Sequence, residues 1–167
     1  MTPRNLVLAF ALMLSGGLSQ AGDIVAIENF EKVNLAKLPE NYKSNEPVHL
    51  SIADEPGRGK VLKITNKQDG YPFFGFLLNA TKLKGRNIRV SAWGKFPGNY
   101  TPAPGKSWAR PHMQLQIQVK DRKDPLFFGQ DPQPNRPDWQ LLTASTTVDA
   151  QAEKVEAYVR VDMVAAE

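Results

Sequence analysis

HMQLQIQVK, residues His112–Lys120, is the most regular stretch of the chain. Its apolar residues are Met113, Leu115, Ile117 and Val119, and its polar residues are His112, Gln114, Gln116, Gln118 and Lys120. Strand side chains alternate between two faces, so the stretch predicts a β-strand with one face in a core. Each glutamine offers two donors and an acceptor without charge, which suits a ligand rich in hydroxyl groups. The alternative is an ordinary solvated strand face.

The rest of the chain is also divided into short apolar segments by its 13 prolines and 12 glycines. Segments typical of strands are residues 23–30, 47–53, 60–65, 71–79, 87–95, 126–128, 138–146 and 154–164. Helix signals are nearly absent. Short alternating segments separated by turns predict an all-β sandwich with antiparallel sheets.

The first 21 residues have the pattern of a secretory signal peptide. Arg4 precedes the apolar run Leu6–Leu14, which is too short to span a bilayer, and Ser19-Gln20-Ala21 has the small residues of a cleavage site. The sequence therefore predicts an exported protein, periplasmic or secreted, with one domain over residues 22–167. No other stretch is apolar enough to cross a membrane.

Composition excludes several classes of function. The net charge is +4, and +3 without the signal, whose one charged residue is Arg4. These charges are scattered and show no basic-aromatic motif, so we expect no nucleic-acid partner. The chain has no cysteine, which excludes disulfides, thiol catalysis and thiolate metal sites.

Five motifs in order resemble a known family. They are ENFE at residues 28–31, VLKI after Gly59-Lys60, LKGRNIRVSAWGK, DWQLLTAST and VEAYVRVDMV. Together they resemble the carbohydrate-binding modules of families 4, 9 and 22, over most of residues 27–164. The resemblance implies a β-jelly roll with a galactose-binding-like topology, here of about eight to nine strands. The long loop Pro97–Pro111 and the absence of an attached glycosidase depart from that pattern.

The resemblance implies a glycan-binding groove on a concave sheet face. Aromatic rings there stack on sugars, while amides and arginines bind hydroxyl groups. The residues that would fill these roles are Arg89, Trp93, Trp108, His112, Gln114, Gln116 and Gln118, with Tyr100 beside Trp108 on the long loop. The alternatives are packing roles for the tryptophans and a surface role for Arg89. Trp139 is expected to be structural.

The same resemblance implies a structural calcium ion. Calcium takes carboxylate and carbonyl oxygens. Glu31 and Asp162 would supply carboxylates and Lys60 a backbone carbonyl. The alternative is two ordinary surface acids.

The sequence carries no strong catalytic signature, and we expect a binding protein rather than an enzyme. His49 and His112 lack metal-ligand spacing, and no nucleophile elbow is present. The function predicted is that of an exported, non-catalytic module for a glycan or polysaccharide. The alternatives are a structural or protein-interaction protein of the cell envelope and, less favoured, a polysaccharide lyase or hydrolase.

Overall fold

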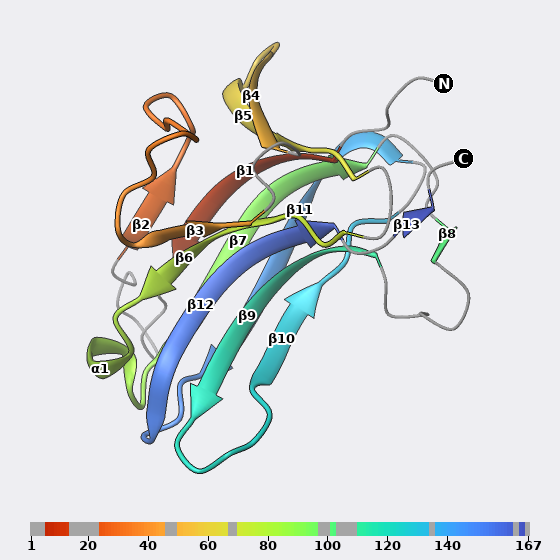
Figure 1. Ribbon diagram of the computed structural model, residues 1–167. Coiled ribbons are helices and arrows are strands. Elements are labelled where there is room, and N and C mark those ends of the chain that lie inside the picture. The colour runs from red at the N-terminus through yellow and green to blue at the C-terminus, as the bar shows by residue number, and fades with distance from the viewer. Residues whose placement is uncertain are drawn as a thin grey trace.

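The computed structural model is an antiparallel β-sandwich, as the alternation predicts (Figure 1). It describes residues 6–13, 24–45, 50–66, 70–96, 101–102, 110–133, 136–161 and 164–165. This part of the chain contains thirteen strands, more than the eight or nine expected, because the segments 6–13, 42–44, 101–102 and 164–165 also form strands or add a separate strand.

One layer is a six-stranded sheet with the order β11-β7-β1-β5-β4, to which β2 adds by pairing with β1. Its strands are β1 (Leu6–Met13), β2 (Ile24–Glu28), β4 (Leu50–Glu55), β5 (Gly59–Ile64), β7 (Asn87–Phe96) and β11 (Arg136–Thr147). The predicted turn at residues 54–59 is the β4–β5 hairpin, in which Gly57 and Gly59 take positive φ angles.

The other layer is a five-stranded sheet with the order β10-β9-β12-β6-β3. Its strands are β3 (Tyr42–Ser44), β6 (Phe73–Leu78), β9 (Pro111–Val119), β10 (Leu126–Gln130) and β12 (Ala152–Val161). The strand β9 is the regular stretch that the sequence identified, and it lies between β10 and β12. A separate two-stranded sheet joins β8 (Thr101–Pro102) to β13 (Val164–Ala165).

The core lies between the two large sheets and takes residues from both. The six-stranded sheet contributes Leu62, Ile64, Val90, Ala92 and Leu142, and the five-stranded sheet contributes Phe74, Met113, Leu115, Ile117, Val155 and Val159, all at most 2% exposed. The aromatic ring of Phe74 packs edge-on against Phe30 at 5.6 Å. Burial of these alternating residues fixes the register of each strand, because a slip by one residue would expose them.

Two elements differ from expectation. The link after β6 contains the short helix α1 (Ala80–Leu83), whose first turn is capped by the Asn79 side chain accepting from the Lys82 amide. The apolar run expected in a signal peptide forms strand β1 in the structure of the whole chain. Removal of residues 1–21 on export stays a prediction.

Within the residues that the structure describes, no helix has the length and apolar character needed to cross a bilayer.

Candidate functional site

The outer face of the five-stranded sheet collects the glutamine ladder of β9 with polar and aromatic residues of its neighbours. We call this surface the glutamine face, made of Lys43, Phe73, His112, Gln114, Gln116, Phe127, Lys154, Glu156, Tyr158 and Arg160. Cross-strand partners lie side by side on one face of a sheet. The register therefore aligns Gly75, Tyr158, Gln114 and Gly129 in one row, with Phe73, Arg160 and His112 on one side and Leu77, Glu156, Gln116 and Phe127 on the other.

Tyr158 anchors the central row. Its hydroxyl donates to Oε1 of Gln114 at 2.8 Å, and the residue is only 6% exposed. Gly75 on β6 and Gly129 on β10 lie at the two ends of this row. A Cβ on Gly75 would lie 2.5 Å from the Ala157 carbonyl oxygen and from Cβ of Tyr158. The glycines thus allow close approach of neighbouring strands beneath the polar groups.

His112 and Arg160 form a second fixed pair. Nε of Arg160 donates to Nε2 of His112 at 3.1 Å, so this ring nitrogen is an acceptor and carries no proton. Burial first, and then the positive charges of Arg160 and Arg110, lower the pKa of His112 from 6.5 to about 3. His112 is therefore neutral at physiological pH and orients Arg160.

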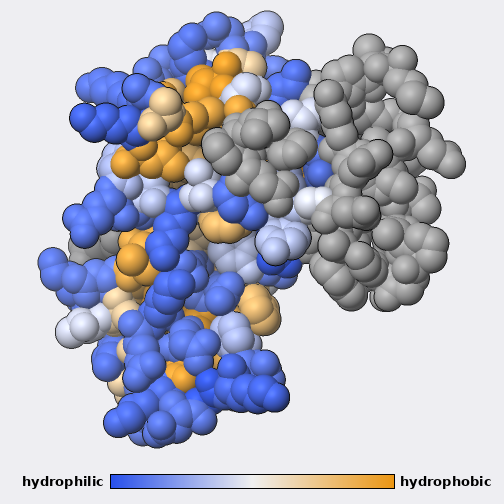
Figure 2. Space-filling model, in the orientation of Figure 1, coloured by the Kyte–Doolittle hydropathy of each residue, from blue (hydrophilic) through white to orange (hydrophobic). Residues whose placement is uncertain are grey.

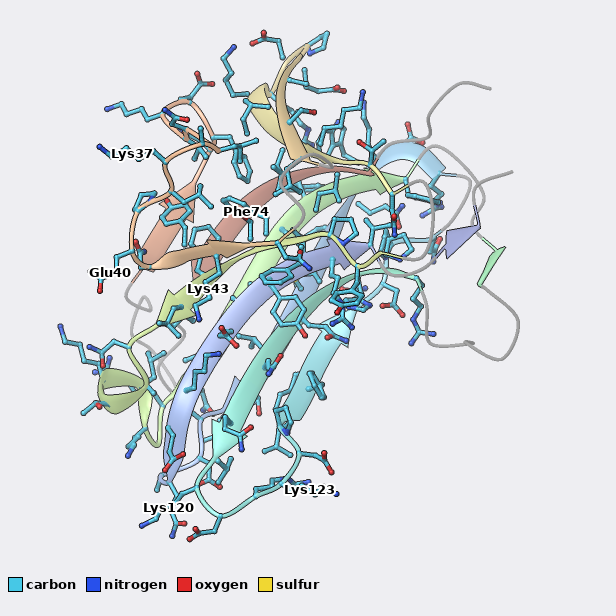
Figure 3. The ribbon with its side chains drawn as sticks, in the orientation of Figure 1. Lys37, Glu40, Lys43, Phe74, Lys120 and Lys123 are labelled. Carbon is cyan, nitrogen blue, oxygen red and sulfur yellow. The ribbon has the colours of Figure 1, made fainter. Side chains whose placement is uncertain are left out.

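Glu156 lies between two lysines of the same sheet. Its carboxylate is 3.5 Å from Nζ of Lys43 on β3 and 2.8 Å from Nζ of Lys154 on β12. The glutamate side chain is 15% exposed, whereas each lysine side chain is 42% exposed. The carboxylate is thus held beneath two accessible ammonium groups, and Figure 3 shows Lys43 on the β3 side of the face.

Gln116 is the glutamine whose amide is available to a ligand. Within the described residues it makes no side-chain hydrogen bond, although it is half-buried beside Glu156. On the neighbouring strand β10, its register partner is Phe127, which is 52% exposed. An open amide beside an exposed ring is the combination that holds a sugar by hydrogen bonds and stacking.

A shallow pocket opens at the centre of the face. Its volume is about 90 Å³, and its lining includes Lys43, Phe73, Gln116, Glu156, Tyr158 and Arg160. That volume holds roughly three waters. A ligand larger than this would lie across the sheet rather than inside it. Figure 2 views this side of the molecule, where hydrophilic residues predominate with smaller hydrophobic areas between them.

Gln118, the third glutamine of the ladder, has a structural role instead. Its Nε2 donates to the Arg122 carbonyl at 2.7 Å and to the Val119 carbonyl at 3.3 Å. These bonds hold the turn between β9 and β10. The expectation that all three glutamines face a ligand alike therefore does not describe Gln118.

The structure does not bring Arg89 and Trp93 to the glutamine ladder. Both lie on β7, in the six-stranded sheet, where they are exposed while Ile88, Val90 and Ala92 of the alternate face are buried. Trp93 instead shares a cation with Trp139, because the Arg58 guanidinium lies 4.7 Å from one ring centroid and 4.5 Å from the other. Trp108 and Tyr100 lie outside the described residues.

The calcium ligands are brought together only in part. The Lys60 amide donates to Oε1 of Glu31 at 3.0 Å, so these two residues are neighbours as the resemblance implies. Asp162 lies outside the described residues. In the described part of the chain no three His, Cys, Asp or Glu side chains cluster as metal ligands, and one oxygen of Glu31 already accepts an amide. Calcium binding stays a prediction, and the glutamine face does not depend on it.

Several residues of the face were missing from the sequence prediction. Tyr158, Glu156 and Arg160 alternate along β12 and could be assigned to an outer face, but only the pairing of β12 with β9 places them beside the glutamines. Phe127 and Lys43 come from short edge strands. No local pattern connects these edge residues to β9.

Comparisons with protein-family models, with curated proteins and with solved structures found no match for the chain. The resemblance to carbohydrate-binding modules therefore stays a prediction.

Proposed function

We propose that the protein is an exported, non-catalytic module that binds a polysaccharide across the glutamine face. The observation that carries this proposal is the open amide of Gln116 beside exposed Phe127, set among side chains already fixed by Tyr158–Gln114 and Arg160–His112. Groups held in place before binding lose little entropy when a ligand arrives.

Charge favours an acidic glycan over a neutral one. Lys43, Lys154 and Arg160 carry three positive charges against one negative charge on Glu156, and the lowered pKa of His112 keeps that ring neutral. The net charge of the face is thus +2. Carboxylate or sulfate groups on the sugar chain would pair with the two exposed ammonium groups.

The lyase alternative is less well supported. A lyase base must reach a substrate proton, yet His112 is 4% exposed and its Nε2 already accepts from Arg160. This arrangement favours a binding role.

An array of acidic and neutral polysaccharides, probed with the exported protein, tests the proposal. We expect binding to uronate-containing or sulfated chains that weakens as salt rises. Parallel wells with calcium and with a chelator test the metal prediction separately. If the folded protein binds none of the polysaccharides on the array, the proposal is wrong.

Variants then locate the site. We expect Gln116→Ala and Phe127→Ala each to weaken binding about tenfold, which corresponds to about 1.4 kcal/mol. Gln151→Ala is the matched control, because Gln151 is an exposed glutamine at the β11–β12 turn. Loss of binding in Trp93→Ala, with Gln116→Ala unaffected, would move the site to the other sheet.

A further inference from the structure

Strand β1 fills an interior position of the six-stranded sheet. It pairs antiparallel with β7 over Val7–Met13 on one side, and with β5 over Leu6–Leu8 and β2 over Phe10–Met13 on the other. In the described sheet β5 and β7 pair with β1 and not with each other. Without β1, therefore, β7 on one side and β5 with β2 on the other present unpaired backbone edges, and together they form a slot one strand wide.

The core side of the slot requires apolar residues at alternate positions. Leu62, Ala92 and Val90 are 0% exposed and are the register partners of Leu8, Phe10 and Leu12. Any strand that replaces β1 sets its matching residues against these buried groups. Apolar residues at the three positions 8, 10 and 12 are therefore needed to close the core.

The solvent side of the slot favours acidic residues at its two ends. Lys63 and Lys95 are both register partners of position 7, and exposed Arg89 is the partner of position 13. Lys95 is already ion-paired with Glu55, so Lys63 is the cation that an acid at position 7 would meet. Position 11 lies opposite Ser91, which is buried, and so favours a small residue. The slot therefore fits an extended segment with an acid, three alternating apolar residues and a second acid. The chain's own Val7 and Met13 lack those charges.

We propose that, once residues 1–21 are removed on export, this slot receives a strand from a partner protein with that pattern, antiparallel to β5 and β7. The inference rests on the proposed export and is independent of the glycan proposal, because the slot and the glutamine face are on different sheets. Strand addition of this kind takes affinity from backbone hydrogen bonds and specificity from alternate side chains. A second copy of the chain would also lack residues 6–13, and its β2 has only five residues for a slot of eight positions.

The test begins with the whole chain carrying a protease site between residues 14 and 23. After folding and cleavage, fluorescent ten-residue peptides are offered in trans, and uptake is followed by anisotropy and by hydrogen exchange of the β5 and β7 amides. One peptide has the sequence of residues 5–14, a second adds Val7→Glu and Met13→Glu, and a third replaces Leu8, Phe10 and Leu12 by serine. We expect uptake of the first two, about tenfold tighter binding of the acidic peptide at low salt, and none of the third.

The exported protein completes the test through its intact mass and its size in solution. A mass that lacks residues 1–21, with slow exchange in β5 and β7 only when one of the first two peptides is present, supports the proposal. Retention of residues 6–13, a dimer that protects β5 and β7 without peptide, or equal uptake of all three peptides overturns it. Glycan binding measured in the same samples shows whether the two proposals fail separately.

Discussion

The two outer faces of the sandwich hold their polar and aromatic residues in different ways. On the glutamine face, Tyr158 and His112 are buried and fixed by side-chain hydrogen bonds across strands. On the six-stranded sheet, Arg58 is exposed and reaches from a hairpin turn over Trp93 and Trp139. The first arrangement keeps donors and acceptors oriented for a ligand. In the second, a cation of the same chain already occupies one position over the two rings, although Trp93 stays 39% exposed.

The largest effect that separates the faces should come from pH. The pKa of His112 is lowered to about 3 in the folded protein, so the unfolded chain takes up the proton first as pH falls below 6.5. The contribution of His112 to the free energy of unfolding is therefore fully present at neutral pH. It is lost on acidification, by about 3 kcal/mol between pH 6.5 and 4. Urea unfolding at several pH values measures this slope. His112→Gln should flatten it, and an unchanged slope would mean that His112 is not buried neutral.

A smaller loss of stability is expected from Gly75→Ala. The new Cβ would meet backbone and Tyr158 atoms at 2.5 Å, and overpacking of this kind costs about 1–3 kcal/mol. Thermal unfolding measures the cost. Gly57→Ala is the comparison, since it has open space but a φ of +76°. The loss in Gly57→Ala comes from backbone strain alone, and a Gly75→Ala variant as stable as the unmodified protein would show that β6 and β12 do not pack this closely.

Tyr158→Phe should cost about 1 kcal/mol, the usual value of one hydrogen bond, because the Gln114 oxygen loses its donor. A double-mutant cycle with Gln114→Leu, followed by urea unfolding, isolates this contribution. Additive losses in the double variant would show that the pair does not interact in solution.

The smallest effect is expected at the other face. Arg58→Ala removes two exposed cation–π contacts, worth roughly 0.5–1 kcal/mol each, and should change the tryptophan fluorescence. Glycan affinity should be unaffected. Arg86→Ala, at another exposed arginine, controls for the loss of charge. A fall in glycan affinity with Arg58→Ala alone would show that the two faces act together.

The fold was largely predictable, because period-two alternation is a local signal. The sequence HMQLQIQVK indicated β9, and the buried residues of β7 and β12 follow the same rule. The neighbours of each strand were not predictable, since pairing is decided by contacts between distant segments. Trp93 and Gln116 therefore look alike in sequence, as polar or aromatic residues on an outer face, yet they belong to different sheets.

The hydrogen bonds of the glutamine ladder were also beyond the sequence. Gln114, Gln116 and Gln118 have identical local patterns. One accepts from Tyr158, one holds a turn and one is open. These differences arise from residues 4 to 44 positions away along the chain, which strand alternation does not specify.

Strand β1 is the first part of the sheet to be synthesised, whereas its longest partner comes late. Val7 pairs with Lys95 and Met13 with Arg89, so β1 waits unpaired on that side while about eighty further residues are added. Pairings this distant in sequence form slowly. During that interval the eight residues remain accessible, and afterwards they are enclosed by β7 on one side and by β5 and β2 on the other. The predicted export would therefore have to begin before β7 is synthesised and pairs with β1.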